Sequence, residues 1–430
     1  MKKFLFLFFV LLPIFLFARE SDVYIGLSTK YNPNDLPKIG LAANSPSDIA
    51  PEEEKVYSNL FADVLRSDLY RSRYFNIEDT APAQISSLGS QLSTFERKNI
   101  LYYVFFDFSG TDTQDVWQIK AFMYDTSSKK GLLAKSFRVP TKSIRKSAHM
   151  FADQIIKLLT GKRGLSTTKI AFANDSTGRK EIYIVDYDGY NLAKLTNDKS
   201  ISLLPRWANH GTKLYYTTYR NRNPQIYVLD LKENTNSPVM KDKGLNLIGG
   251  VSPDSKKLVM TLSRGQNPSI YLKELASGRT LELTDKYGVD GSPSFSPDGK
   301  FVTFVSNRSG NPQIYIMNLE TQQTRRLTRF NWTDSPQWSP NGDWIAFAGR
   351  QAANHPIDIF LVDITGGQIR QLTADSGSNE DPWWSPDGRF IAFTTNRAGR
   401  RQIYVMDADG SAQHLIANIK GNSFTPSWSD

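Results

Sequence analysis

The stretch Phe295-Ser296-Pro297-Asp298-Gly299-Lys300-Phe301-Val302-Thr303-Phe304-Val305 contains a tight turn followed by a strand. Proline presets φ at the second turn position, aspartate suits the third, and glycine accepts the positive φ that follows. After the turn, apolar and polar residues alternate in a short run, which is typical of a β-strand. The turn recurs intact at residues 385–388 and in varied form at 339–342, 252–255 and 208–211.

Two sets of residues repeat along the chain with a period of about 44. The first set is Ile182-Tyr183, Ile226-Tyr227, Ile270-Tyr271, Ile314-Tyr315, Ile359-Phe360 and Ile403-Tyr404. The second set is Trp207, Val251, Phe295, Trp338, Trp384 and Trp428. Chance does not keep two such sets in phase. Because each period holds short alternating runs separated by turn residues, the repeat predicts several strands rather than a helical array.

Each period accommodates four strands, as in one blade of a β-propeller. In one repeat we expect them at 294–296, 300–305, 313–318 and 325–329. Residues 169–430 number 262, which is six periods of about 44. The first repeat begins at its second strand, and the segment 425–430 ends just after a last anchor tryptophan. We therefore expect the C-terminal strand to complete the first blade and close a six-bladed ring.

The region before the repeat mixes helical and strand patterns. Strands are expected at 38–41, 100–108, 117–123 and 132–139, and helices at 52–72 and 144–158, with Gly161 as a left-handed cap. The predicted fold is thus multi-domain, with a small α/β N-terminal domain followed by an all-β six-bladed β-propeller. The expected divisions are a signal peptide at 1–18, a flexible segment at 19–37, the α/β domain at 38–160, a linker at 161–168 and the propeller at 169–430.

The N-terminus has the pattern of an export signal. Lys2 and Lys3 precede an apolar run from Phe4 to Phe17, and Ala18 stands before a polar stretch. The run is shorter than the roughly 20 residues of a membrane-spanning helix, so cleavage near Ala18 is favoured over an uncleaved anchor. This pattern predicts a mature protein in the periplasm.

Composition excludes several classes of function. Of 430 residues, 40% are hydrophobic and 22% charged, as in folded globular proteins. Lys and Arg exceed Asp and Glu by 9, but no run of five like charges occurs, so a nucleic-acid-binding arm is not supported. Cysteine is absent, which excludes disulfides, cysteine-ligated zinc and thiol nucleophiles.

Two repeated columns have structural interpretations. The aromatic anchors of the second set could stack on a ligand, but one per blade at a fixed position is what packing between blades requires. The acidic or amide column comprises Asp186, Asp230, Glu274, Asn318, Asp363 and Asp407. Because its members lie one per blade, they are too far apart to share a metal ion, and closure of Asx-type turns explains them better.

A binding face is predicted where the loops leading into each blade differ while their flanks repeat. The candidate residues are Leu204, Asn246, Ile248, Asp290, Gly291, Ser292, Thr333, Asp334, Ser335, Asn379, Glu380, Asp381, Phe424 and Thr425. An arginine column lies on the same face and comprises Arg220, Arg264, Arg308, Arg350 and Arg397. These arginines are either solvated loop residues or a cationic rim that steers an acidic partner.

No catalytic residue, metal or cofactor is expected. The four histidines, His149, His210, His355 and His414, have no metal-binding spacing and are interpreted as ordinary surface or turn residues. No G-x-S-x-G sequence occurs. The alternative is a channel-site hydrolase or small-ligand-binding propeller, which would need Asp290, Asp334, Glu380 and Asp381 to converge at the mouth. A third possibility is a general interaction scaffold.

The chain resembles the TolB family, the periplasmic component of the Tol–Pal system. The resemblance rests on the order of export signal, α/β domain and propeller, and on three stretches of sequence. These are Trp384-Ser385-Pro386-Asp387-Gly388, Asn307-Arg308-Ser309-Gly310 leading to Ile314-Tyr315, and Pro37-Lys38-Ile39-Gly40-Leu41.

The resemblance implies a non-enzymatic adaptor that supports outer-membrane integrity and envelope constriction at cell division. Its propeller mouth would receive the peptidoglycan-associated lipoprotein Pal, with Arg264, Arg308 and Arg397 beside the loops. The mature N-terminal segment, including Glu20, Val23, Tyr24 and Ile25, would bind the inner-membrane protein TolA, and the two engagements would be coupled. A monomer is expected, which meets membranes only through its partners and binds no nucleic acid.

Overall fold

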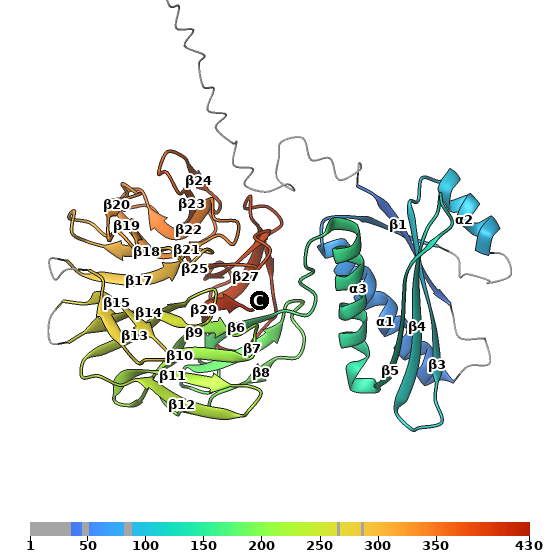
Figure 1. Cartoon of the computed structure of the whole chain (residues 1–430), viewed down its shortest axis with the longest axis horizontal. Coiled ribbons are helices and arrows are strands. Elements are labelled where there is room, and N and C mark those ends of the chain that lie inside the picture. The colour runs from blue at the N-terminus through green and yellow to red at the C-terminus, as the bar shows by residue number, and fades with distance from the viewer. Residues whose placement is uncertain (1–35, 45–50, 81–87, 265–266, 285–287) are drawn as a thin grey trace, which may run out of the picture.

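The computed structural model describes residues 36–44, 51–80, 88–264, 267–284 and 288–430. An α/β part and a β-propeller lie side by side, and helix α3 (Ile144–Thr160) lies between the sheet of the α/β part and the propeller (Figure 1). The predicted export signal at 1–18 and most of the segment 19–37 fall outside the described residues, so neither prediction is tested. Among the described residues, no helix combines the length and the apolar character that crossing a bilayer requires.

The α/β part is built on a five-stranded sheet in the order β2-β1-β3-β4-β5. The strands are β1 (Lys38–Asn44), β2 (Asn76–Asp79), β3 (Tyr102–Gly110), β4 (Val116–Asp125) and β5 (Gly131–Pro140). β1 runs parallel to β2 and β3, whereas β3, β4 and β5 are antiparallel. The sequence did not predict β2, because four residues, two of them acidic, carry too short a pattern to recognise.

Two long helices cover one face of this sheet. Helix α1 (Glu52–Arg71) begins with three glutamates, whose charges are favourable at a helix N-terminus. Its buried side chains pack with those of α3 against the sheet in one hydrophobic core. Gly161 ends α3 with a φ of 71°, which confirms the predicted cap. The short helix α2 (Leu88–Arg97) was not predicted and covers part of the opposite face.

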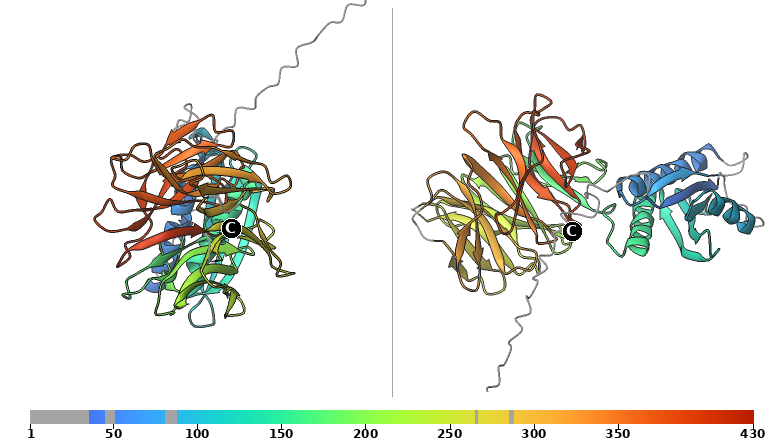
Figure 2. Two further views of the ribbon diagram at one scale, coloured as in Figure 1. Left: turned by 90° about the vertical axis from the view of Figure 1, so that its left-hand side faces the viewer. Right: turned by 90° about the horizontal axis from the view of Figure 1, so that it is seen from above.

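The second part of the chain forms six four-stranded sheets arranged as propeller blades (Figure 2). Blades 2 and 3 contain β9 (Ser202–Ala208), β10 (Lys213–Asn221), β11 (Asn223–Asp230), β12 (Thr235–Met240), β13 (Leu245–Val251), β14 (Lys257–Ser263), β15 (Ser269–Glu274) and β16 (Thr280–Glu282). Blades 4 and 5 contain β17 (Asp290–Phe295), β18 (Phe301–Ser306), β19 (Gln313–Asn318), β20 (Thr324–Arg326), β21 (Trp332–Trp338), β22 (Trp344–Arg350), β23 (Asp358–Asp363) and β24 (Ile369–Gln371). Blade 6 contains β25 (Asn379–Trp384), β26 (Phe390–Thr395), β27 (Gln402–Asp407) and β28 (His414–Leu415).

The repeated turn has the predicted conformation. Gly299 has a φ of 69°, and the equivalent Gly388 has a φ of 73°. The Asp298 carboxylate accepts hydrogen bonds from the Ser296 hydroxyl at 2.5 Å and from the Lys300 amide at 3.0 Å. In blades 3, 4 and 6, serine and aspartate therefore satisfy the polar groups of the turn that joins the two inner strands.

Blade 1 is completed by the end of the chain, as predicted. It contains β6 (Lys169–Asn174), β7 (Glu181–Asp186), β8 (Ala193–Lys194) and the C-terminal β29 (Ser423–Trp428). β29 pairs antiparallel with β6, and Trp428 lies opposite Ile170. Each innermost strand contacts the innermost strands of both neighbouring blades, so β29, β9, β13, β17, β21 and β25 form a closed ring.

The anchor residues pack between blades. Trp207, Phe295, Trp338, Trp384 and Trp428 are buried and Val251 is half-buried. The Trp207 indole N–H donates to the Ser427 carbonyl at 3.0 Å, and that of Trp384 to the Gln337 carbonyl at 3.1 Å. These bonds cross from one blade to the next, so the anchors join the blades as well as filling space.

We predict that Trp428→Ala destabilises the propeller by about 3–5 kcal/mol, the usual range for truncating a buried tryptophan. Trp428 is 5% exposed, and its indole N–H donates to the Thr168 hydroxyl at 2.8 Å. Trp428→Phe should cost less, because it retains most of the buried surface and loses mainly one hydrogen bond, worth about 1 kcal/mol. Denaturant unfolding of both variants measures the difference, and equal stabilities of native chain and Trp428→Ala would contradict closure by β29.

Candidate functional site

The innermost strand of every blade carries an irregularity at the same place. In each pairing of an innermost strand with its neighbour the register shifts near the middle of the strand. Five non-glycine residues adopt a left-handed backbone there: Leu204, Ser292, Ser335, Asp381 and Thr425, with φ between 49° and 55°. Each such residue costs of order 1–3 kcal/mol, and strain of this kind concentrates at binding sites.

These irregular positions meet at the mouth of the propeller channel. A cavity of about 50 Å³ is lined there by one predicted residue from each blade: Leu204, Ile248, Ser292, Ser335, Asp381 and Thr425. The structure thus brings together six of the residues that the varied loops singled out. We call this cavity and its rim the mouth.

Two half-buried aspartates, Asp334 and Asp381, lie at the mouth. Asp334 accepts hydrogen bonds from the Ser292 hydroxyl at 2.7 Å and from the Ser335 amide at 2.6 Å. Asp381 accepts from the Ser335 hydroxyl at 3.2 Å and from the Thr425 amide at 3.3 Å. Burial, reinforced by the charges of Glu380 and Asp334, raises the pKa of Asp381 to about 6. Burial also raises the pKa of Asp334.

A buried arginine forms the floor of the mouth. The Arg206 side chain donates to the Gly249 carbonyl at 2.7 Å and lies 4.6 Å from the Trp383 ring centre. Burial lowers its pKa to about 10, so it stays charged at neutral pH. Arg206 also lines a cavity of about 250 Å³ at the other end of the channel. It therefore separates the two ends.

Sequence reasoning missed Arg206, although a signal was present. Its column across the blades reads Arg206, Gly250, Ser294, Gln337, Trp383 and Ser427. One charged residue in an otherwise uncharged column marks a position with its own role.

Four of the predicted residues are fully buried: Asn246, Asp290, Thr333 and Asn379. Their side chains hold the leading loops in place. The Asn246 amide donates to the Pro224 carbonyl at 3.0 Å, and the Thr333 hydroxyl donates to the Pro312 carbonyl at 3.1 Å. These residues shape the mouth from beneath, because no surface of theirs is open to a partner.

The remaining predicted loop residues are half-buried: Gly291, Glu380 and Phe424. Glu380 accepts from Arg401 at 2.7 Å. The Phe424 ring lies beneath the Lys180 ammonium at 3.9 Å. Glu380 and Phe424 thus present one acidic and one aromatic group beside the cavity.

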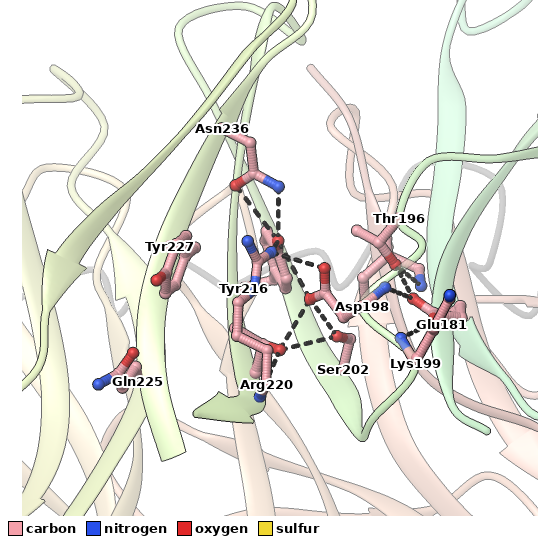
Figure 3. A network of polar contacts seen from close by, with 12 residues as sticks. Glu181, Thr196, Asp198, Lys199, Ser202, Tyr216, Arg220, Gln225, Tyr227 and Asn236 are labelled. Atoms are coloured by element: carbon pink, nitrogen blue, oxygen red, sulfur yellow. Dashed lines mark hydrogen bonds and ion pairs between the residues drawn. The ribbon is translucent and has the colours of Figure 1, made fainter. Parts of the chain in front are cut away.

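The arginine column is largely paired within the protein. Arg220 contacts Asp198 at 2.7 Å, and Figure 3 shows this carboxylate also accepting from Ser202. The equivalent pairs are Arg264 with Asp242 at 2.8 Å, Arg308 with Asp290 at 3.0 Å, and Arg397 with the Asn379 amide oxygen at 3.1 Å. These four guanidinium groups also stack over a tyrosine of the next strand. Pairing reduces the positive field that the column offers a partner.

The alternative prediction of a hydrolase requires four carboxylates to converge at the mouth, and only some of them do. Glu380 and Asp334 both raise the pKa of Asp381, so these three lie close to one another. Asp290 is instead buried against Arg308. Within the described ranges, no group of three or more His, Cys, Asp or Glu side chains is arranged to hold a metal ion.

The interpretation of His149 as a surface or turn residue was wrong. His149 is 4% exposed and lies where α3 meets the propeller. Its burial depends on how the α/β part and the propeller dock, which a local sequence pattern does not show. His210, His355 and His414 are exposed, as expected.

We predict that Asp381→Asn stabilises the propeller at pH 7.5 and has little effect at pH 4. The folded pKa lies above the ordinary carboxyl value, so ionisation of Asp381 lowers stability progressively as pH rises through about 6. The penalty above that pH is at most about 3 kcal/mol. Thermal unfolding of both proteins at the two pH values measures it. An equal difference at both pH values would show that hydrogen bonding, not charge, controls the effect.

Comparison with known proteins supports the fold and extends to both parts of the chain. A family model described as TolB beta propeller domain matches residues 156–430. The Tol-Pal system protein TolB of Geobacter sulfurreducens is 36% identical over 200 residues, which are 46% of this chain and 45% of that protein. The protein of the same name from Desulfosudis oleivorans is 33% identical over 223 residues, 50% of this chain and 49% of the relative. The chain thus spans about half the length of these curated relatives.

A solved structure is similar over a longer stretch. The crystal structure of TolB from Acinetobacter baumannii covers 92% of this chain and 97% of its own, with a TM-score of 0.77 and 27% identity. The likeness therefore includes the α/β part as well as the six blades. Since the family model alone accounts for more than half of the sequence, the chain belongs to the TolB family.

Proposed function

We propose that this chain is a non-enzymatic adaptor of the Tol–Pal system in the periplasm. Its mouth would bind a Pal-like lipoprotein, and its N-terminal segment 19–37 would bind a TolA-like inner-membrane protein. In this role it would support outer-membrane integrity and envelope constriction at cell division. Membership of the TolB family supports the system, and the names of the relatives associate them with it.

The geometry of the mouth is the main support for placing the binding site there. Six innermost strands converge on one cavity, five of them through a left-handed non-glycine residue. Two half-buried carboxylates, Asp334 and Asp381, lie there although desolvation disfavours their charge and raises their pKa values. A fold that only needed to close its ring would have no use for either feature, whereas a binding surface uses both.

The floor of the mouth favours a partner that inserts a short segment rather than one that threads through. Arg206 and Trp383 lie across the channel, and both line the cavities above and below them. The open volume above them is about 50 Å³. A protein partner would thus contact mainly the rim, including Phe424 and Glu380.

We predict that Phe424→Ala weakens binding of the periplasmic domain of a Pal-like lipoprotein about tenfold or more, as loss of an aromatic anchor commonly does. The matched control is Leu281→Ala, which truncates a 40% exposed side chain on the outer strand β16, away from the mouth. Calorimetric titration of native chain and both variants measures the affinities. If Phe424→Ala bound with native affinity while Leu281→Ala bound more weakly, the binding site would not be at the mouth.

We predict that deleting residues 20–34 abolishes binding of a TolA-like protein and changes the affinity for the Pal-like protein by about 5- to 150-fold, the range of typical coupling free energies. The deletion ends before Leu36, where the described residues begin, so the sheet keeps all of β1. Titration of each partner alone and in the presence of the other gives the coupling. Unchanged affinities for both partners would reject the segment as the second site.

A further inference from the structure

A cluster of buried charged groups joins the α/β part to the propeller. Asp68 of α1 and His149 of α3 come from one side, and Tyr187 and Asp188, which follow β7, come from the other. The His149 Nδ1 and Asp68 Oδ2 atoms are 2.7 Å apart, and the Tyr187 hydroxyl donates to the other Asp68 oxygen. Asp68 and His149 are 2% and 4% exposed.

One atom of this cluster has no hydrogen bond. The Nε2 atom of His149 is buried without a partner and lies 3.6 Å from the Asp188 carboxylate. When the imidazole is neutral and donates from Nδ1 to Asp68, Nε2 presents a lone pair to a negative charge. When the imidazole is protonated, Nε2 carries a proton and the same contact becomes an attraction between opposite charges.

We propose that His149 is a proton-operated latch between the α/β part and the propeller, which holds the two together when protonated and loosens when neutral. Both members of the Asp68–His149 pair belong to the α/β part, whereas Asp188 belongs to the propeller. Docking brings the negative charge of Asp188 close to Nε2 of His149, so the strength of the contact between the two parts depends on whether His149 is protonated.

The charged groups around His149 favour its protonated form. Burial opposes the charge on His149 and Arg145 repels it, but the hydrogen bond to Asp68 and the charges of Asp68 and Asp188 prevail, and the pKa of His149 is raised. Burial raises the pKa of Asp68 as well. Arg145 also pairs with Asp188 and stacks 3.7 Å from the Tyr190 ring centre, so Asp188 keeps a cation beside it at every pH.

Protons can reach the cluster from solvent. A cavity of about 210 Å³ between the two parts is lined by Asp68 and Tyr187. Arg71, at the end of α1, lines the same cavity and acts on Tyr187 through its charge. Another contact across the boundary joins Arg73 to Asp407 at 3.5 Å, and burial raises the pKa of Asp407, on which the charges of Arg73 and His414 also act.

The sign of the effect follows from linkage. In the proposed latch, docking brings the Asp188 carboxylate to His149 and thereby raises the affinity of the imidazole for its proton, so the stabilisation of the docked form is complete below the pKa of the undocked imidazole. It is lost as pH rises through the higher, docked pKa. The docking equilibrium should change by up to about tenfold for each unit by which docking raises that pKa.

The test measures the distance between the two parts as a function of pH. Because the chain has no cysteine, Ser127→Cys and Glu320→Cys introduce a unique pair of labelling sites on the two parts. Energy transfer in the full chain should report less docking at pH 8.5 than at pH 6. His149→Gln and Asp188→Asn should flatten this dependence, whereas His355→Gln, at an exposed histidine, should preserve it. A flat profile in the native chain, or an unchanged profile in both latch variants, would overturn the proposal.

A second measurement does not depend on the stability of the His149 variant. The chain has four histidines, so each imidazole can be followed by NMR through its titration. The midpoint of His149 should lie above that of an ordinary histidine and fall in Asp188→Asn, where the new amide oxygen can still accept from Arg145. An unchanged midpoint in that variant would show that the contact at 3.6 Å does not hold the proton.

Discussion

The antiparallel pairing of β29 with β6 is the interaction on which the rest of the structure depends. Each blade buries its faces only against its neighbours, so an open arc would expose a hydrophobic face at each end. The pairing joins the last strand of the chain to the first strand of the propeller and completes a ring of six inner strands. Trp428 fills the space between these blades, and the linker residue Thr168 accepts its indole N–H.

Closure of the propeller ring also determines where the mouth forms. Since the ring is shut, all six innermost strands face a single channel, and residues that are about 44 positions apart in the chain become neighbours around one mouth. The start of the propeller lies beside α3, where Tyr187 and Asp188 contact Asp68 and His149. The single mouth is therefore a consequence of one strand pairing.

The mouth and the domain boundary both contain charged side chains that are shielded from solvent, but the charges have different partners in the two regions. At the mouth, Asp334 and Asp381 lie close together with raised pKa values, and their nearby guanidinium, Arg206, is committed to backbone carbonyls and an aromatic ring. At the domain boundary, each acid has a direct partner of opposite or variable charge. The acids at the mouth thus lie beside one another, whereas those at the boundary are paired with cationic or titratable groups.

The sequence by itself determined the repeat, the four-strand blade, the closing strand and the helices α1 and α3, because these follow from periodicity and turn chemistry, which act over a few residues. It also selected the loops that form the mouth. The sequence did not indicate β2 or α2, whose patterns are short, nor that Asn246 and Thr333 face inward.

Only the tertiary structure decided the roles of Arg206 and His149. Each lies in an unremarkable local pattern, and each acquires its environment from residues on other elements: Gly249 and Trp383 for the arginine, Asp68 and Asp188 for the histidine. Burial and charge depend on distances through space, and those distances exist only once the blades have closed and the two parts of the chain have docked.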